Sequence, residues 1–257
     1  GKTESRDGTV QEDFDKIITS GEYLMGLIND VLDMSRIENG RILLHPENTD
    51  TGELLNSVLT IVGPQIKKRN IRFEVKSSGV ASRYVVIDRM RVLQIYINLL
   101  NNAIKFSAPG TTIEFCVHYE PAGENLVGTT VVIRDQGCGM SEEFLKRIFS
   151  PFEQEHNQYS DSQPGTGLGL AIVKNLLDQM GGGIQVESRL GEGTAFTITL
   201  TVPKGCEPEK AAPPEPPNLP VKLSGSRVLL AEDHPTNAEI VRKLLEKEGV
   251  LLEHAPD

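Results

Sequence analysis

The sequence lacks the long apolar run and the excess of positive charge that would direct a protein to a membrane or to nucleic acid. No apolar stretch approaches the roughly 18 residues of a membrane-spanning helix, and no secretory leader is expected from this sequence. Asp and Glu number 36 against 26 Lys and Arg, which gives a formal net charge of −10. General attraction to nucleic acid or to an anionic membrane is therefore not expected, and any phosphate-binding site must be local.

Cysteine is also scarce. The sequence has three cysteines, Cys116, Cys138 and Cys206, an odd number without the spacing of metal ligands. A disulfide framework is therefore not expected, and the composition fits a protein of the reducing cytosol. The 257 residues suffice for one or two domains. Because the sequence begins with Gly1 rather than methionine, we expect it to be part of a longer chain.

The chain is organised around an expected helix over residues 88–107. Its polar residues fall on one narrow stripe, Arg91, Gln94, Asn98, Asn101, Asn102 and Lys105. A solvated face is the ordinary explanation of such a stripe, but it usually carries Glu and Lys, whereas Asn is a poor residue inside a helix. Asn98, Asn102 and Lys105, at i, i+4 and i+7, form a row able to hold Mg²⁺ and phosphate oxygens.

The other elements predict an α+β fold with helices on one face of a mixed sheet, a two-layer α/β sandwich. A helical pattern over residues 14–37 has an apolar stripe that needs a partner helix. Further helices are expected from Thr51, whose hydroxyl can cap the first turn, to 66, and over 141–148 and 168–180. Strands are expected over residues 71–76, 84–87, 111–119, 129–133, 184–188 and 194–202.

A proline-rich segment then marks a domain boundary. Seven prolines lie between positions 203 and 220, which predicts an extended linker. A buried strand over 227–231, a helix over about 236–248 and a strand from Val250 follow, and together they predict the start of a βαβ unit.

Two glycine-rich loops suggest a nucleotide site. Asp135 follows a strand, and its carboxylate can accept a hydrogen bond from the exocyclic amine of adenine, although an Asp before Gly also simply stabilises turns. Gly165, Gly167 and Gly169 open a helix and leave backbone N–H groups bare toward an anion. A dinucleotide-binding βαβ motif is disfavoured because no strand directly precedes Gly165.

These stretches carry a resemblance. In order, NLLNNAIKFS, DQGCGM, IFSPFEQ, GTGLGLAI and GEGTAFTITL resemble the N, G1, F, G2 and G3 boxes of the ATP-binding domain of sensor histidine kinases, the Bergerat fold. SGEYLMGLINDVLDMSRIENGRI resembles the second helix of the dimerisation and phosphoacceptor domain, and RVLLAEDHPTN the start of a flavodoxin-like receiver domain. The arrangement is that of hybrid kinases, with expected boundaries at 1–44, 45–203, 204–224 (linker) and 225–257 (truncated receiver).

The resemblance implies a site for ATP and Mg²⁺. Asn102 would ligate Mg²⁺, Asn98 and Lys105 would approach the phosphates, and these three would be the catalytic residues. Asp135 would hold the adenine amine. The other implied nucleotide contacts are Phe106, Gly137, Gly139, Met140, Phe152, Gly165, Thr166, Gly167, Leu168, Gly169, Leu170 and Thr194. In the receiver, Glu232 and Asp233 would bind Mg²⁺.

The implied function is transfer of the γ-phosphoryl group of ATP to a histidine on the phosphotransfer helix of the protein's own dimer, and then to the aspartate of a receiver or response regulator. The chain would be the cytoplasmic portion of a homodimeric sensor that could be membrane-anchored. None of the five histidines lies in the family's phosphoacceptor pattern, so that histidine should precede residue 1, and the receiver aspartate should follow Asp257. No Lys or Arg lies between Arg147 and Lys174, so ADP should bind about as well as ATP.

Two alternatives stay open. A gyrase-like or mismatch-repair-like ATPase shares this pocket but uses a glutamate base on the Asn-rich helix, and Asn98 at that position disfavours it. A pseudokinase would use the nucleotide only as a conformational signal and work as a phosphatase or scaffold, and the lid without a cation favours it.

Overall fold

The computed structural model describes residues 43–79, 82–155, 166–207, 225–231 and 235–255, together with residues 21, 24–26, 28 and 31–35. The chain divides into two compact units, Gly1–Glu207 and Pro208–Asp257. Gly165, Glu232, Asp233 and the proline-rich segment after residue 207 lie outside the described residues.

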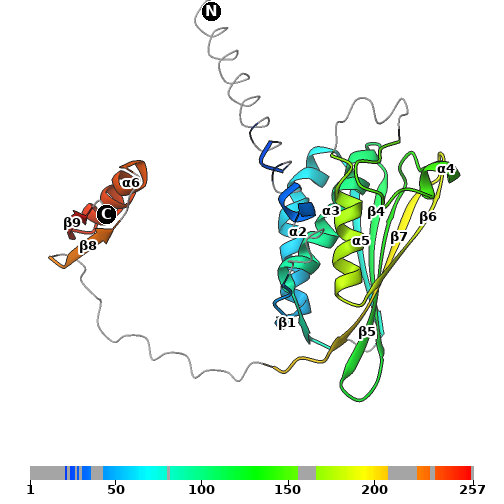
Figure 1. The fold of residues 1–257 in the computed structure, drawn as a ribbon, viewed down its shortest axis with the longest axis horizontal. Helices are drawn as coiled ribbons and strands as arrows, with labels where there is room; N and C mark the ends of the chain where they lie inside the picture. Colours follow the sequence, from blue (N-terminus) through cyan, green and yellow to red (C-terminus); the bar gives the residue numbers. More distant parts are fainter. Residues whose placement is uncertain are drawn as a thin grey trace, which may run out of the picture. The chain divides into compact units, whose positions relative to one another are not determined.

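The first unit is built on a five-stranded mixed sheet in the order β2-β4-β5-β7-β6. β2 and β4 are parallel, and the remaining neighbours are antiparallel. Helices α2, α3 and α5 cover one face of this sheet (Figure 1), so the predicted two-layer α+β architecture is confirmed. The strands are Arg72–Gly79 (β2), Thr112–Pro121 (β4), Leu126–Asp135 (β5), Gly183–Arg189 (β6) and Gly193–Pro203 (β7), and the helices are Thr51–Lys68 (α2), Arg89–Phe106 (α3), Glu142–Leu145 (α4) and Gly169–Gln179 (α5).

Helix α3 lies in the middle of the helical layer and forms much of the core. Leu99 and Leu100 are completely buried, and the ring of Tyr96 meets Phe115 of β4 edge to face with centroids 5.4 Å apart. Apolar residues therefore occupy most of the helix circumference, and the predicted polar stripe is left on the remaining side.

Asp88 is the N-cap of α3. Its carboxylate accepts hydrogen bonds from the backbone N–H of Arg91 at 3.0 Å and of His45 at 2.9 Å. The Asp88 side chain is buried, so it fixes both the first turn of α3 and the segment that enters the domain.

Replacing Asp88 with alanine is expected to lower the free energy of unfolding by about 1 to 3 kcal/mol, because the first turn of α3 and the backbone N–H of His45 both lose their acceptor. Chemical denaturation of the parent and the variant measures this difference. Asp88→Asn keeps one oxygen acceptor and should lose less. Equal stability of the alanine variant and the parent would contradict the role given to this cap.

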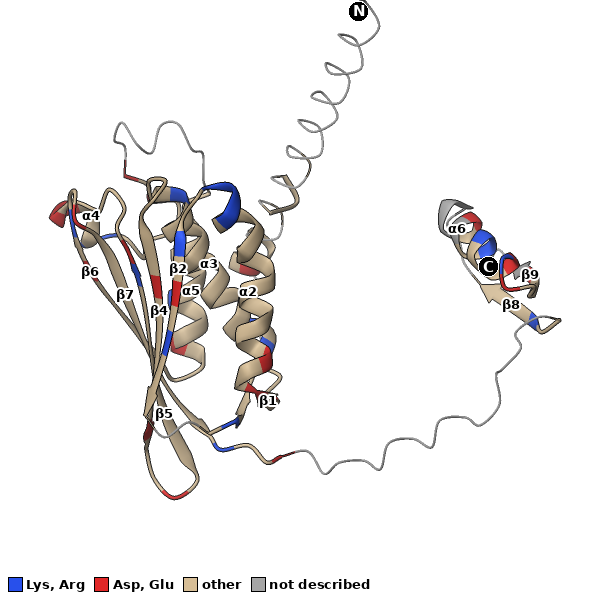
Figure 2. Cartoon of the chain, turned by 180° about the vertical axis from the view of Figure 1, so that it is seen from behind, with Lys and Arg blue, Asp and Glu red and all other residues tan. Residues whose placement is uncertain are grey.

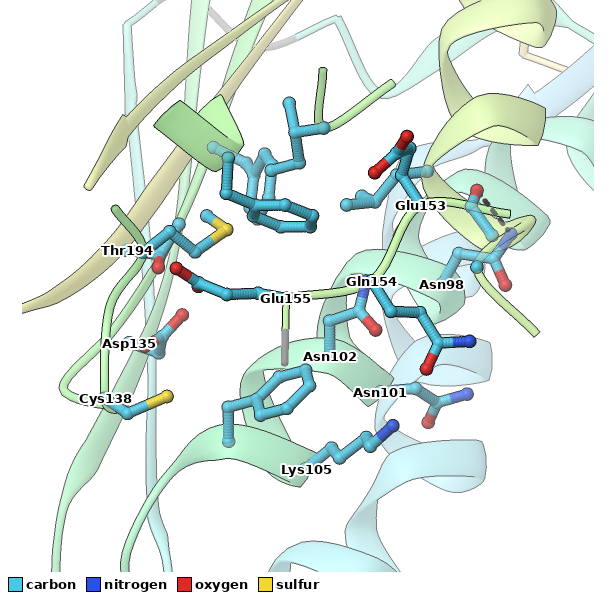
Figure 3. A pocket seen from close by; sticks show the side chains of 18 of the residues that line it. Asn98, Asn101, Asn102, Lys105, Asp135, Cys138, Glu153, Gln154, Glu155 and Thr194 are labelled. Carbon is cyan, nitrogen blue, oxygen red and sulfur yellow. Dashed lines mark hydrogen bonds between the residues drawn. The ribbon is translucent and has the colours of Figure 1, made fainter. Parts of the chain in front are cut away.

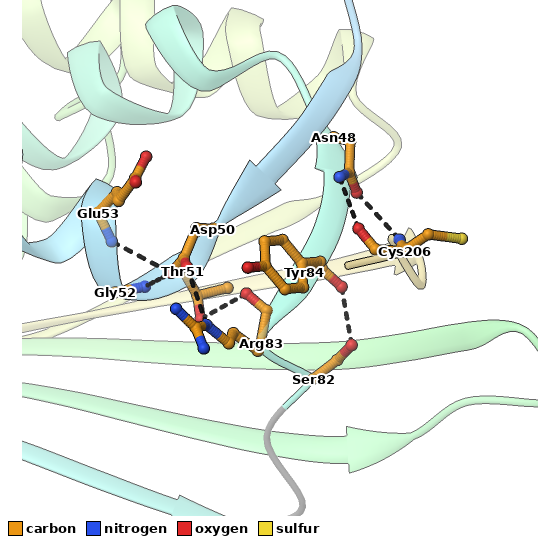
Figure 4. A network of polar contacts seen from close by, with 9 residues as sticks. All are labelled: Asn48, Asp50, Thr51, Gly52, Glu53, Ser82, Arg83, Tyr84 and Cys206. Carbon is orange, nitrogen blue, oxygen red and sulfur yellow. Dashed lines mark hydrogen bonds and ion pairs between the residues drawn. The ribbon is translucent and has the colours of Figure 1, made fainter. Parts of the chain in front are cut away.

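A two-stranded ribbon, β1 (Glu47–Asp50) paired with β3 (Tyr84–Ile87), lies at the start of the domain. Strand β1 was not predicted. The side chain of Asp50, rather than the predicted Thr51, caps α2, by accepting from Gly52 N at 2.7 Å (Figure 4). The correction has a simple cause: Asp50 holds the extended N-cap conformation, whereas the Thr51 hydroxyl donates to the carbonyl of Arg83.

The same ribbon holds the end of the domain. The Asn48 side chain makes two hydrogen bonds with the backbone of Cys206, to its carbonyl at 2.7 Å and from its N–H at 3.1 Å (Figure 4). Gly205 N donates to Tyr84 O at 2.8 Å, and Lys204 forms an isolated antiparallel β-bridge with Val85. After β7 has ended, hydrogen bonds to the backbone and to the Asn48 side chain of the ribbon thus fix residues 204–206.

Charged residues at two helix ends complement the helix dipoles (Figure 2). Lys67 and Lys68 lie in the last turn of α2, and Glu142 and Glu143 lie in the first turn of α4. The Ser141 hydroxyl caps α4 by accepting from Phe144 N, and the helix is shorter than the predicted 141–148.

The described residues of the predicted N-terminal helix are helical, and they expose Leu24, Ile28 and Val31. Within this helix, Asp33 accepts a hydrogen bond from Gln94 of α3 at 2.7 Å and lies 3.5 Å from Arg91. Polar contacts therefore join this helix to the domain that follows.

The second unit contains the predicted βαβ arrangement. Strand β8 (Arg227–Ala231) leads into α6 (Pro235–Glu246), and β9 (Leu251–Ala255) pairs with β8 in parallel. Parallel neighbours require a crossover connection, which α6 provides. Across both units, the three cysteines are free, and none of the described helices is long and apolar enough to span a bilayer.

Candidate nucleotide-binding site

A cavity of about 310 Å³ lies between α3, the start of α5 and the ends of strands β5 and β7. Figure 3 shows polar side chains of α3 along one side of it and Asp135 with Thr194 at the opposite end. Its lining residues are Asn98, Asn101, Asn102, Lys105, Phe106, Asp135, Cys138, Gly139, Met140, Phe144, Ile148, Glu153, Gln154, Glu155, Thr166, Gly167, Gly169, Leu170, Thr194 and Phe196.

The polar stripe of α3 forms the cavity wall rather than a solvated surface. Asn98, Asn102 and Lys105 all line the cavity, as the spacing predicted. The Asn98 amide donates to the carbonyl of Gly169 at 3.5 Å, which joins α3 to the beginning of α5. Lys105 is half-buried with its ammonium 4.9 Å from the centre of the Phe106 ring, and burial lowers the pKa of this amine.

Asp135 lies at the other end of the cavity, as the last residue of β5. Burial raises the pKa of its carboxyl to about 6, and hydrogen bonds from the backbone N–H groups of Gly137 and Thr194 only partly offset this. The carboxylate accepts from Gly137 N at 2.8 Å, so the turn-stabilising role is present as well. The side chain still faces the cavity and can accept a further donor from a ligand.

Two of the cavity glycines hold conformations that other residues rarely adopt. Gly139 has φ +64, and a Cβ atom there would lie 1.9 Å from the carbonyl of Arg189. Gly167 has φ +70, and its Cβ would lie 2.7 Å from the carbonyl carbon of Phe152. Only glycine therefore fits at these two positions of the cavity wall, because a side chain there would clash with the neighbouring backbone.

Most of the predicted nucleotide contacts line this one cavity, but three described ones do not. Leu168 is buried in the core, Phe152 is 69% exposed, and Gly137 packs against the carbonyl of Phe106. For these three, the geometry indicates a part in shaping the loops. Gly165 is outside the described residues.

The cavity also includes residues that the sequence did not single out as ligand contacts. They are Asn101, Cys138, Phe144, Ile148, Glu153, Gln154, Glu155 and Phe196. Asn101 belongs to the same polar stripe, so its position could have been found from helical spacing. The apolar members come from distant segments, and no local pattern distinguishes them from ordinary core residues.

No group of three His, Cys, Asp or Glu side chains suited to a metal ion occurs among the described residues. The cavity instead offers neutral amide oxygens on α3. Such a donor set fits Mg²⁺, which is usually bound through one or two protein oxygens, several waters and the phosphates of a substrate.

Comparison with known proteins agrees with this geometry. Residues 87–204 match the sequence model of the family described as histidine kinase-, DNA gyrase B-, and HSP90-like ATPases. This part of the chain belongs to that family and is an ATPase domain of the histidine kinase type.

The relatives are sensor kinases. The chain is 33% identical over 245 residues to the autoinducer 2 sensor kinase/phosphatase LuxQ of Vibrio vulnificus (strain YJ016), covering 95% of this chain and 28% of LuxQ. It is 35% identical over 231 residues to the sensor histidine kinase GacS of Pseudomonas protegens, covering 90% and 24%. The structure of full-length ShkA in complex with AMPPNP is 27% identical, with a TM-score of 0.62 over 96% of this chain and 48% of ShkA. The chain thus spans about a quarter of the length of these curated relatives.

Proposed function

We propose that the chain is the ATP-binding catalytic portion of a hybrid sensor histidine kinase. It binds Mg·ATP in the α3 cavity and donates the γ-phosphoryl group to a histidine on a helical phosphotransfer domain. The observation that carries this proposal is the position of the Asn98–Asn102–Lys105 row opposite Asp135 in one cavity. A ligand that spans it needs a hydrogen-bond donor at one end and phosphates at the other. ATP fits both requirements, and AMPPNP in the related ShkA structure supports this choice.

The chain's own residues would act by binding and positioning. Asp135 would accept the adenine amine, the backbone at Thr166–Gly167 and Gly169–Leu170 would face the phosphates, and Asn102, with Asn98 beside it, would hold Mg²⁺ by its amide oxygen. The bound metal neutralises phosphate charge. Phosphoryl transfer depends mainly on position and charge neutralisation, so these groups would supply most of the catalysis.

The phosphoryl group would pass from the histidine to an aspartate of a receiver domain. The parallel βαβ unit supports this assignment, since a receiver begins with such a unit, as does the predicted acidic pair Glu232 and Asp233 for its Mg²⁺. The partners would be the phosphotransfer helix of the protein's own dimer and a receiver or response regulator.

A second candidate is a nucleotide-sensing scaffold or phosphatase. It is favoured by the acidic side chains of Glu153 and Glu155 in the cavity wall and by the absence of Lys and Arg from the sequence between Arg147 and Lys174. Such a protein would bind nucleotide and transfer no phosphoryl group.

A phosphotransfer assay separates the two. The chain is incubated with ATP labelled in the γ position, with and without a separately supplied dimeric helical domain that carries the phosphoacceptor histidine. We expect acid-labile label on the helical domain and none on the chain alone, because attack requires an acceptor held about 3 to 3.5 Å from phosphorus. Calorimetry confirms in parallel that ATP is bound. Binding without any label on the helical domain would favour the scaffold.

A further inference from the structure

The cavity lining includes Glu155, which is carried neither by α3 nor by the strand ends that hold Asp135 and Thr194. Glu155 follows the turn after α4, and its carboxylate accepts a hydrogen bond from the backbone N–H of Ser141 at 3.1 Å. In Figure 3 the Glu155 side chain lies across the cavity, with its carboxylate toward Asp135 and Thr194. It therefore lies where the purine ring is expected.

The neighbouring residues support this position. Cys138, which lines the same end of the cavity, has its thiol pKa raised first by burial and then by the nearby charges of both Asp135 and Glu155. Two carboxylates thus lie close to one thiol. The neighbouring Glu153, by contrast, is 3.3 Å from Arg147 in an ion pair.

We infer that Glu155 occupies the adenine end of the cavity in the nucleotide-free protein, and that an adenine nucleotide must displace it. The inference rests on the proposed function. Binding of the base then requires that the Ser141–Glu155 hydrogen bond break, and Glu155 lowers the affinity for every ligand that carries adenine. The apparent affinity equals the intrinsic affinity multiplied by the fraction of molecules in which the site is free.

The contact has a second consequence. Ser141 is the N-cap of α4, so Glu155 joins the segment of residues 153–155 to the helix whose Phe144 lines the cavity. Arrival of the base would release residue 155 from α4. Adenine recognition and the position of this segment are therefore coupled through one backbone hydrogen bond.

The test is titration of ATP, ADP and adenosine into the parent, Glu155→Ala and the matched control Glu143→Ala. Glu143 is an exposed carboxylate in the first turn of α4 that does not line the cavity. If the site is free about one-tenth of the time, Glu155→Ala should bind all three ligands about tenfold more tightly, and the control should match the parent. Adenosine is the decisive ligand because it carries no phosphate.

A gain confined to ATP and ADP would mean that Glu155 acts only by repelling phosphate, and would overturn the inference. So would unchanged or weaker binding by Glu155→Ala. The backbone amide signal of Ser141 gives a second measurement: it should move on adding adenosine to the parent, toward its position in nucleotide-free Glu155→Ala. If neither the parent nor the variants bind adenine nucleotides, the proposed function fails; if the parent binds and the alanine variant gains nothing, only this inference fails.

Discussion

An Asn102→Asp variant is expected to transfer phosphoryl groups at least about a hundredfold more slowly than the parent. Asn102 lies in the middle of the cavity wall on α3, one turn after Asn98. Its neutral amide can offer an oxygen to Mg²⁺ without adding negative charge. A carboxylate at the same position would repel the phosphate oxygens and alter the coordination of the metal.

The measurement is the initial rate of label transfer to the histidine-bearing helical domain at saturating Mg·ATP. Asn125→Asp makes the same chemical change in the exposed turn between β4 and β5 and should retain the parent rate. A thermal melt of each protein shows whether the fold is kept. An Asn102→Asp variant as fast as the parent would remove Asn102 from the mechanism.

Replacing Asp135 with asparagine is expected to weaken ATP binding by about 10- to 100-fold, because a hydrogen bond to a charged acceptor is worth about 1.5 to 3 kcal/mol. The same change should stabilise the nucleotide-free domain at pH 7. Burial raises the pKa of this carboxyl from 3.8 to about 6, so its ionisation opposes folding.

The sign of the pH dependence follows from this shift. The stability associated with protonated Asp135 is fully present below its ordinary pKa of 3.8 and is lost as the pH rises through about 6. At pH 7 the asparagine variant should therefore have a free energy of unfolding about 1 to 3 kcal/mol higher than the parent. The difference should shrink toward pH 4. ATP affinity should change in the opposite direction, falling in the parent as the pH drops through about 6.

Urea denaturation and calorimetry at pH 7.5 and 5.5 test both effects. Asp178→Asn is the control, since Asp178 is exposed and paired with Lys174 on the helix surface, and it should change stability by no more than about 0.5 kcal/mol. If the parent binds ATP and GTP equally, or if the asparagine variant is less stable at pH 7, Asp135 does not have this role.

Local sequence patterns predicted the parts of the site that lie on regular elements. The stripe from Asn98 to Lys105 follows from helical spacing alone, because every residue of α3 has a fixed direction once the apolar face is known. Asp135 was found because it ends a strand of β-branched residues and lies two residues before Gly137. The sheet strands also appeared where expected, although β5 and β4 each extend further than their β-branched cores.

The remaining features depend on tertiary contacts. Glu47–Asp50 has no apolar alternation, and it becomes a strand only because β3 pairs with it. Phe144 and Phe196 reach the cavity from segments far apart in sequence. Glu155 also depends on tertiary structure, because no spacing rule could predict that its carboxylate would reach Ser141.

The ribbon of β1 and β3 has a consequence for how this domain is carried within a longer polypeptide. The chain enters the sheet domain through β1, and residues 204–206 leave it hydrogen-bonded to Asn48 and Tyr84 of the same ribbon. The segments by which the chain enters and leaves the domain are therefore neighbours in space, although nearly all residues of the domain lie between them in sequence. A module with adjacent ends can be inserted between other domains, exchanged or duplicated without rerouting the flanking chain.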